Sequence, residues 1–304
     1  MSPPETKDSS SSVIPLFAIL FLSIIIRSSI VQEELALIYL PSQIKFLAGV
    51  EKEPELNAHA YLVKIIGEKY PLAKRREWKM VPPASLTKLL TAVMAKEKLA
   101  EDEFIILSPK AKAVEEKRSR VPQEEKMLRD DWIKAAIIES ANDAALALAE
   151  ALGKKQGARS YEENMEIFKR LAAEKALEIG MQSFQIANPT GLDETRHLIS
   201  AADLALLAEY IWYNHPDIWE MSRAVEATVR SITQQEYVFK NTNDLLKEFP
   251  AILGGKTGFT DNAKGTLLFL YPLKSGKIAS VIILGSEDRF GDGRKIIQWL
   301  ESNL

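Results

Sequence analysis

The positions of apolar residues along the chain predict several amphipathic helices in its middle part. From Leu128 to Gly153, from Tyr161 to Met181 and from Ser200 to Asp217, apolar residues recur every three to four positions, so each helix is expected to bury one face. Ser200 is expected to be the N-cap of the third helix, and glycines near the ends of the first two are expected to be C-caps. A further helix is predicted from Val81 to Ala100, after a turn that contains two prolines.

Runs of β-branched and aromatic residues on both sides of this helical part predict strands. The first pair consists of His59 to Ile66 and a returning strand within residues 67–80, and the C-terminal runs are "TVRSIT", "QEYVFKN", "GTLLFLYPL" and "KIASVIILGS". The last two runs flank "KSGK", a hairpin signal, and "GRKIIQWLESNL" predicts a closing helix. This order predicts an α+β fold: an antiparallel sheet flanked by the first and last helices, with an all-helical lobe inserted at roughly residues 100–225. A site is expected where the sheet and the lobe meet.

The N-terminal residues predict an export segment that precedes the folded domain. A polar tail, residues 1–12, leads into a stretch from Val13 to Ile26 that is apolar apart from one serine. An uncleaved transmembrane anchor over residues 13–31 is favoured over a cleaved signal segment, because no A-x-A-like cleavage pattern follows. Residues 32–56 are then a tether, and residues 57–304 form the folded domain outside the cytoplasmic membrane. Cleavage of the segment would make the domain a secreted protein.

Composition excludes several classes of function. The chain has 304 residues, 46% hydrophobic and 27% charged, with a net charge of −3, so no basic surface for nucleic acid is predicted. It has no cysteine, which excludes disulfides, thiolate nucleophiles and thiolate metal sites. The three histidines, His59, His197 and His215, lack the spacing of a zinc site and are interpreted as solvated or locally bonded. Neither a metal nor another cofactor is therefore expected.

Ser85 and Lys88 stand three residues apart at the start of the predicted helix 81–100, where their side chains lie on one face. A buried amine loses part of its preference for the charged form, and a neutral amine can take the proton of a serine hydroxyl. The pair is therefore a candidate nucleophile and base. The alternative is a serine N-cap beside a solvated lysine, and the spacing also arises by chance, since Ser42 and Lys45 repeat it.

Two further short motifs follow along the chain. Ser140 and Asn142 stand in "IIESANDAA", a predicted break between two helical halves. Lys256, Thr257 and Gly258 stand in "GGKTGFTDNAKG", where a glycine-rich turn is predicted to enter the last strand pair. Each motif alone has a structural explanation: a helix cap, a helix break or a hairpin turn. A chance origin would require all three explanations to hold at once, so the set favours a catalytic site.

The chain resembles the low-molecular-weight penicillin-binding proteins, the serine-type D-alanyl-D-alanine carboxypeptidases, over roughly residues 57–303. The resemblance extends to "PPASLTKLLTA", "IIESANDAALALAE", "IGMQSFQIANPTGLD", "ISAADLALLAEY", "NTNDLLKEFPAILGGKTGFTDNA" and "VIILGSEDRFGDGRKIIQWL". It implies the serine β-lactamase/transpeptidase-like fold and removal of the terminal D-Ala from peptidoglycan stem peptides through an acyl-enzyme. β-Lactam antibiotics are the implied inhibitors, and the extracytoplasmic face of the bacterial cytoplasmic membrane is the implied location.

The resemblance also implies a role for each residue of the three motifs. Ser85 attacks the carbonyl of the penultimate D-Ala, Lys88 is the base, and Ser140 relays a proton to the departing amine. A positive Lys256 would help to keep Lys88 neutral. The implied substrate-binding residues are Asn142 for the amide, Lys256 and Thr257 for the terminal carboxylate, and Gly258 and Phe259 next to them, with the backbone N–H groups of Ser85 and Phe259 as the oxyanion hole.

Three alternatives remain open on the sequence. A D,D-endopeptidase shares every motif, and a non-catalytic cell-wall-binding module would be expected to lose a catalytic residue. A class A β-lactamase needs a glutamate-activated water, and its pattern E-x-x-L-N is absent after Asn142, where "YEENMEIF" offers acids in another arrangement. The chain departs from the family at Ala172, Ala173 and Lys264. It also stops after the last helix of the catalytic domain, so the N-terminal segment is expected to supply the membrane attachment.

Overall fold

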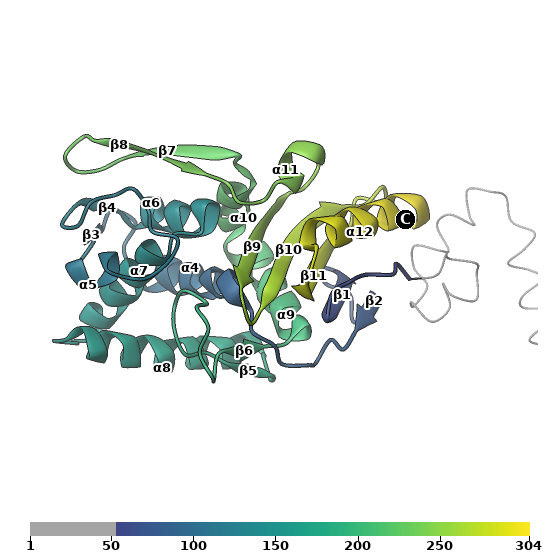
Figure 1. Cartoon of the computed structure of the whole chain (residues 1–304), viewed down its shortest axis with the longest axis horizontal. Helices are drawn as coiled ribbons and strands as arrows, with labels where there is room; N and C mark the ends of the chain where they lie inside the picture. The colour runs from purple at the N-terminus through teal and green to yellow at the C-terminus, as the bar shows by residue number, and fades with distance from the viewer. Residues whose placement is uncertain (1–52) are drawn as a thin grey trace, which may run out of the picture. The chain divides into compact units, whose positions relative to one another are not determined.

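The computed structural model describes residues 53–304, and its centre is a five-stranded antiparallel sheet (Figure 1). The strands are β1 (Ala60–Ile65), β2 (Pro71–Arg75), β9 (Gly254–Thr260), β10 (Lys264–Pro272) and β11 (Ile278–Ser286), in the order β2-β1-β11-β10-β9. Each neighbouring pair is antiparallel. Strands from the two ends of the domain therefore pair directly, β1 with β11, and the inserted lobe lies between β2 and β9 in the sequence.

Side chains alternate between the two faces of this sheet, and helices cover both faces. Leu268 belongs to the main hydrophobic core, whereas Phe269 faces α12 (Arg289–Asn303). On the core side, α9 (Ala201–Asn214) packs on β1 and β11, and α10 (Pro216–Arg223) packs on β9. The predicted antiparallel sheet flanked by helices is confirmed. The helix that lies along the core side is α9, however, and not the first helix of the domain, which runs into the lobe.

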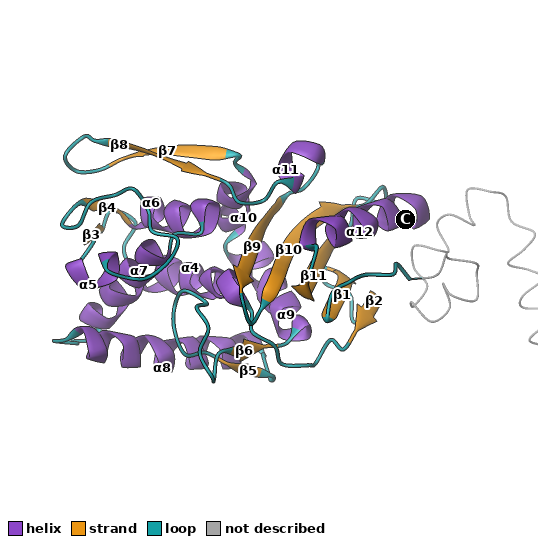
Figure 2. Cartoon of the chain, viewed as in Figure 1, coloured by secondary structure: helices purple, strands orange, loops and turns teal. Residues whose placement is uncertain are grey.

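The lobe combines helices with two short two-stranded antiparallel sheets (Figure 2). Its helices are α4 (Thr87–Lys98), α5 (Pro109–Lys112), α6 (Arg129–Lys134), α7 (Asn142–Lys155) and α8 (Tyr161–Ile179), and a π-helical turn at Ala135–Glu139 joins α6 to α7. The paired strands are β3 (Phe104–Ile106) with β4 (Lys126–Leu128) and β5 (Phe184–Gln185) with β6 (Leu198–Ile199). The lobe is therefore not entirely helical. A hairpin, β7 (Glu226–Arg230) with β8 (Glu236–Lys240), and α11 (Leu245–Glu248) follow before β9.

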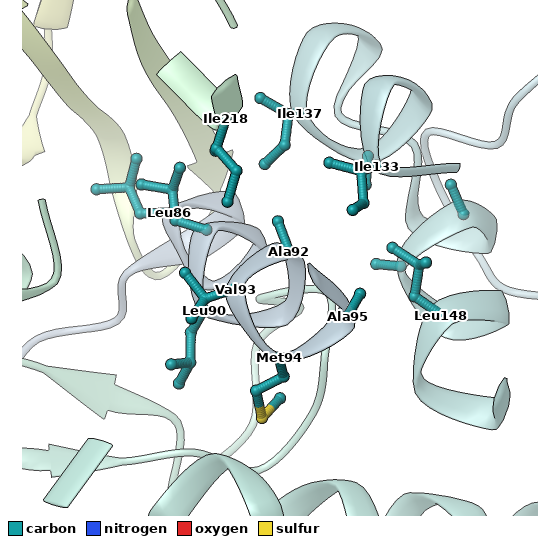
Figure 3. Packing of buried hydrophobic residues seen from close by; sticks show 14 of the residues in the cluster. Leu86, Leu90, Ala92, Val93, Met94, Ala95, Ile133, Ile137, Leu148 and Ile218 are labelled. Atoms are coloured by element: carbon teal, nitrogen blue, oxygen red, sulfur yellow. The ribbon is translucent and has the colours of Figure 1, made fainter. Parts of the chain in front are cut away.

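Helix α4 lies at the centre of the hydrophobic core. Leu90 and Met94 are at most 1% exposed, and Figure 3 shows α4 surrounded by side chains that include Ile137, Leu148 and Ile218 from neighbouring elements. A helix that is apolar on most of its circumference is stable only when it is buried in this way. The packing fixes the start of α4, where the candidate nucleophile lies, against the rest of the domain.

Two of the expected helix caps are confirmed. Ser200 accepts a hydrogen bond from the N–H of Asp203 at 3.1 Å at the start of α9, and Gly180 ends α8 with a φ of 93°. Gly153 does not end its helix, because α7 continues beyond it. A Cβ at position 153 would lie 2.6 Å from the Cα of Asn164 on α8, so this glycine allows two helices to pack closely.

The predicted N-terminal elements lie outside the described residues. They are the polar tail 1–12, the anchor or signal segment 13–31 and nearly all of the tether 32–56, and the second serine–lysine spacing at residues 42–45 lies there as well. Within residues 53–304, no helix combines the length and the apolar character needed to cross a bilayer. The domain bounds given by the sequence stay predictions.

Candidate active site

Ser85 and Lys88 meet at the start of α4. Ser85 lies in the 3-10 turn Ala84–Leu86 that leads into the helix, and Lys88 lies in the first helical turn. The Nζ of Lys88 is 2.8 Å from the Oγ of Ser85. Lys88 is completely buried, and Ser85 is 7% exposed. Neither the 3-10 turn nor α4 has a side-chain cap, so Ser85 is not the N-cap that the alternative interpretation requires.

The partners of Lys88 are oxygen atoms of three residues. Its Nζ also lies 2.7 Å from Oδ1 of Asn142 and 2.6 Å from the carbonyl oxygen of Thr190, and both oxygens can only accept. A charged amine would donate to all three oxygens, whereas a neutral amine can donate to these two and turn its lone pair to the hydroxyl of Ser85. Burial lowers the pKa of Lys88 well below its usual value, and the positive charge of Lys117 lowers it further. This environment therefore favours the neutral form of the amine beside Ser85.

A second buried pair joins the lobe to the sheet. Ser140 follows the π-helical turn with a left-handed φ of 65°, and its Oγ lies 2.9 Å from the Nζ of Lys256 on β9. Lys256 also donates to the carbonyl oxygen of Thr257 at 2.8 Å. Burial, followed by the charge of Lys88, lowers the pKa of Lys256. The sequence predicts burial as the cause of a neutral Lys88, with Lys256 as a helping charge; in the structure burial is the largest cause, and the charge that follows it is that of Lys117.

The K-T-G residues, 256–258, lie in the edge strand β9 and not in the predicted glycine-rich turn. Residues 254–260 pair along β10. Gly258 packs directly on the nucleophile, because a Cβ at this position would lie 2.7 Å from the backbone N of Ser85. Phe259, the next residue, is 47% exposed. The glycines of this stretch allow two backbones to approach each other closely. The sequence alone does not distinguish this role from that of a glycine in a turn.

The structure brings the predicted site residues together. One hydrogen-bonded group contains Ser85, Lys88 and Asn142, a second contains Ser140, Lys256 and Thr257, and Gly258 and Phe259 continue β9 beside Ser85. The start of α4, the lobe and the sheet each contribute side chains. This is the meeting point of sheet and lobe at which the sequence predicts a site.

Three further residues of this region are not predicted by the sequence. Thr190 contributes a carbonyl oxygen, which no pattern of side chains reveals. Lys117 has a φ of 35°, and its carbonyl accepts from the N–H of Asn142 at 2.8 Å. Arg289 begins α12, and its buried Nε has no hydrogen-bond partner among residues 53–304. Burial lowers the pKa of Lys117 and of Lys256, and the charge of Arg289 lowers both further. No sequence spacing connects these residues to the three motifs.

The chemical inventory of the site favours nucleophilic acyl transfer. Within residues 53–304, no His, Cys, Asp and Glu side chains form a group of three or more that could hold a metal ion. The hydrogen bonds of Ser85, Lys88 and Ser140 in this part of the chain involve no carboxylate. Glu166 of "YEENMEIF" is instead paired with Lys169 on α8. A serine with an amine base, and a second serine held by a lysine, are the reactive groups that remain.

Comparison with known proteins connects this geometry to a family. Residues 49–286 match the family described as D-alanyl-D-alanine carboxypeptidase. The D-alanyl-D-alanine carboxypeptidase DacF of Bacillus subtilis is 31% identical over 188 residues, which are 60% of this chain and 46% of that protein. The D-alanyl-D-alanine endopeptidase of Pseudomonas aeruginosa is 28% identical over 269 residues, which are 84% of this chain and 81% of that protein. The chain thus spans less than half of the first relative and most of the second.

Solved structures share the fold. The D-alanyl-D-alanine carboxypeptidase from Mycobacterium tuberculosis superposes with a TM-score of 0.72 at 23% identity, over 83% of this chain and 94% of that one. A DD-transpeptidase of Streptomyces superposes with a TM-score of 0.75 at 20% identity, over 83% of this chain and 100% of that one. The serine β-lactamase/transpeptidase-like fold that the resemblance implies is therefore confirmed.

Proposed function

Because the chain belongs to the D-alanyl-D-alanine carboxypeptidase family, we propose that it is a serine D,D-carboxypeptidase acting on peptidoglycan stem peptides. The observation that carries this proposal is the geometry of Lys88, whose buried Nζ lies 2.8 Å from the Oγ of Ser85. A general base must lie within this distance of the proton that it removes.

The first half of the reaction forms an acyl-enzyme. The Oγ of Ser85 attacks the carbonyl carbon of the penultimate D-Ala, while the hydroxyl proton passes to Lys88. The carbonyl oxygen becomes an oxyanion, for which the N–H groups of Ser85 and Phe259 are the proposed donors. Gly258 supports this assignment, because its close approach to the backbone N of Ser85 brings β9 alongside the nucleophile. In other enzymes one such donor contributes about 10²–10³ in rate.

The second buried pair supplies the proton for the leaving group. When the C–N bond breaks, the departing D-Ala amine takes a proton from the hydroxyl of Ser140, which Lys256 holds at 2.9 Å. Proton transfer from Lys88 through Ser140 restores the starting protonation states. Water then attacks the acyl-enzyme with Lys88 again as the base, and this step releases the trimmed peptide and regenerates Ser85.

The terminal carboxylate of the substrate matches the positive charge at the site. Thr257 offers a hydroxyl on β9, and Arg289 offers a buried Nε that has no hydrogen-bond partner among residues 53–304. Burial lowers the pKa of Lys256, but a bound carboxylate favours its charged form, which then provides a positive field. A carboxylate that satisfied this Nε would form a charge-assisted hydrogen bond, which is stronger than a neutral one. Asn142 is the proposed contact for the substrate amide; its side chain lies beside the base, accepts from Lys88 and donates to the carbonyl oxygen of Glu116.

A D,D-endopeptidase is the second candidate function. The observation that favours it is the P. aeruginosa relative, which bears this activity in its name and matches over most of its length. A β-lactamase is less well supported, because no carboxylate of residues 53–304 hydrogen-bonds to the serine–lysine pair. A non-catalytic wall-binding module is disfavoured by the intact hydrogen-bonded set of serines and lysines.

The proposal extends to location and inhibitors. Residues 13–31 are proposed to anchor the chain in the cytoplasmic membrane with the domain on the extracytoplasmic face, where peptidoglycan is assembled. β-Lactams are proposed to acylate Ser85, because they present an activated amide and a carboxylate in the arrangement of D-Ala-D-Ala.

Labelling with a fluorescent penicillin tests the proposed function. The full chain is incubated with the penicillin, and in parallel with peptides that end in D-Ala-D-Ala or carry a D-Ala cross-link. We expect an adduct on Ser85 in the mass spectrum of the digest, release of D-Ala from the linear peptide, and no adduct in Ser85→Ala. An adduct on Ser42, or no labelling of folded protein, would contradict the proposal, and faster cleavage of the cross-link would favour the endopeptidase.

A further inference from the structure

His197 is a buried histidine that the proposed mechanism does not use. It is 2% exposed and immediately precedes β6. Its Nδ1 accepts hydrogen bonds from the backbone N–H groups of Ala187 at 3.1 Å and Asn188 at 3.3 Å. Its Nε2 lies 2.7 Å from Oγ1 of Thr87 on α4. The imidazole is locally bonded, as the sequence predicts, and it bridges the 187–191 loop and the helix that follows the nucleophile.

These contacts fix the tautomer of His197. Because two N–H groups point at Nδ1, this nitrogen carries no proton, and Nε2 carries the proton of the neutral ring. Nε2 then donates to Oγ1 of Thr87, and the Thr87 hydroxyl donates in turn to the carbonyl oxygen of Ala84 at 2.9 Å. Burial, and then the charge of Lys88, lowers the pKa of His197 to about 4, so the ring stays neutral at neutral pH.

The carbonyl at the end of these hydrogen bonds belongs to a strained residue. Ala84 has a φ of 49°, a left-handed conformation that is unfavourable for a residue with a Cβ, and it immediately precedes Ser85. Gly191 packs on the same carbonyl, since a Cβ at this position would lie 1.8 Å from the Ala84 oxygen. Backbone strain of this kind persists where surrounding contacts hold it. Thr87 and Gly191 provide two such contacts.

The 187–191 loop also holds the base. The carbonyl oxygen of Thr190 accepts from Lys88 at 2.6 Å. Oδ1 of Asn188 accepts from the hydroxyl and N–H of Thr190 and from the N–H of Gly191, which fixes the loop internally. His197 binds the backbone of this loop at Asn188. One imidazole thus contacts both the loop that orients the amine and the helix whose first turn holds the backbone before the nucleophile.

We propose that His197 is a positioning residue of the serine–lysine pair, acting through Thr87 on the backbone before Ser85 and through the 187–191 loop on Lys88. The inference rests on the proposed acyl-transfer function, because the position of the amine matters if Lys88 deprotonates Ser85. His197 hydrogen-bonds to neither reacting side chain. A displacement of about 1 Å between reacting groups can slow a reaction about 10²-fold, which gives the expected size of the effect.

Variants of His197 and Thr87 test separately the two residues that connect the 187–191 loop to Ala84. His197→Ala removes the bridge, and Thr87→Val removes the hydroxyl that links the imidazole to Ala84. Thr87→Ser keeps that hydroxyl and is the conservative counterpart. His59→Ala is the matched control, because His59 is exposed and immediately precedes β1.

Acylation rates of the full chain provide the first measurement. Thermal melting verifies that each variant is folded. Kinetics with a fluorescent penicillin then separate the rate constant of acylation from the dissociation constant of the complex that forms before acylation. We expect His197→Ala and Thr87→Val each to slow the acylation step by about 10- to 100-fold. Thr87→Ser and His59→Ala should stay close to the wild type. The double variant should be no slower than the slower single variant, because both residues act through the same hydrogen bonds.

The tautomer provides a measurement that does not depend on catalysis. In ¹⁵N-histidine NMR of the unreacted chain, His197 should show an unprotonated Nδ1 and a protonated Nε2 between about pH 5 and 8. Folded His197→Ala and Thr87→Val proteins that acylate at the wild-type rate, additive effects in the double variant, or a protonated Nδ1 would each overturn the inference. A wild type with the expected tautomer but no acylation would overturn the proposed function, and the positioning role with it.

Discussion

The Nζ of Lys256 on β9 lies 2.9 Å from the Oγ of Ser140 in the lobe, so a buried hydrogen bond crosses from the sheet to the lobe at the active site. The bond between Lys88 and Asn142 likewise links α4 to the start of α7, at 2.7 Å. The hydrogen bonds of both lysines therefore depend on how α4, α7 and β9 pack together. Substitutions that preserve charge but change shape or protonation are expected to separate their roles.

Replacing Lys88 by arginine is expected to nearly abolish acylation. A guanidinium keeps its proton in a protein, so Lys88→Arg loses the base while retaining the positive charge. The loss of a general base corresponds to about 10²–10⁴ in rate. Lys256→Arg should be milder, because Arg can partly supply the positive field for the substrate carboxylate. The acylation rate with a chromogenic β-lactam measures both effects.

Thermal melting establishes that these two variants are folded, and Lys154→Arg, at a side chain that is 52% exposed on α7, is the control. A Lys88→Arg protein that acylates at nearly the wild-type rate would contradict the assignment of the base. So would a Lys256→Arg protein that is the more damaged of two equally folded variants.

Acylation should be lost as the pH falls through the pKa of Lys88, because its protonated form cannot accept the proton of Ser85. Burial and the charge of Lys117 lower this pKa, while Asp143 opposes them. Lys117→Gln removes one lowering charge, so the acid limb of the pH–rate profile should move to higher pH. Lys110→Gln, at an exposed side chain on α5, should leave the profile unchanged. A limb that moves to lower pH, or does not move, in Lys117→Gln would show that Lys117 does not act on the base.

Arg289→Gln should weaken the binding of peptides that end in a free carboxylate. The loss of a hydrogen bond to a charged group, about 1.5–3 kcal/mol, corresponds to roughly 10- to 100-fold in KM or in kcat/KM. Peptides with a C-terminal amide should bind equally weakly to both proteins. Arg294→Gln is the control on the same helix, since Arg294 pairs with Glu248 at the surface. Equal losses for the free acid and the amide would exclude a contact to the carboxylate.

Gly258→Ala should slow acylation more than it destabilises the fold. The new Cβ would lie 2.7 Å from the backbone N of Ser85 and so would displace either β9 or the nucleophile. Gly276→Ala is the contrasting variant: its φ is 78°, but no atom lies within 4 Å of the new Cβ. It should cost about 1–2 kcal/mol of unfolding free energy and leave the acylation rate unchanged. Denaturant unfolding and acylation kinetics together distinguish the two cases, and wild-type acylation by Gly258→Ala would rule out the proposed contact.

The membrane anchor is tested on the full chain expressed in a bacterium. If residues 13–31 remain as an anchor, the protein should stay with membranes after a high-salt wash and begin at or near Met1. N-terminal sequencing of the mature protein decides the question. A soluble protein that begins at about residues 28–35 would instead identify a cleaved signal segment.

The local geometry of the first motif follows from its sequence spacing. Residues three positions apart at the start of a helix share a face, so Ser85 and Lys88 meet without help from the rest of the chain. The break at Ser140 and the cap at Ser200 follow equally from the local preferences of serine, asparagine and aspartate. The period of apolar residues similarly predicts the long helices and the two C-terminal strands β10 and β11.

At several glycines the local sequence pattern predicts the wrong secondary structure. The glycines around Lys256 predict a turn, yet they lie in β9, and Gly153 predicts a helix end, yet it lies inside α7. In both places the missing Cβ makes room for a neighbour from another element: the backbone of Ser85 in one case and that of Asn164, on the next helix, in the other. Some glycines are needed for an unusual backbone conformation, and others are needed because a neighbouring backbone packs closely on them. The sequence does not distinguish these two roles.

By itself, the sequence determines the fold class, the family and the residues that carry the proposed chemistry, because these depend on residue types and on spacings within a helix turn or a strand. Only the tertiary structure decides the pKa and the orientation of the Lys88 amine. Its depressed pKa arises from complete burial and from the nearby charge of Lys117, and its orientation arises from the carbonyl of Thr190. The pKa of an amine depends on the solvent and charges around it, and elements far apart along the chain supply these only after they have packed together.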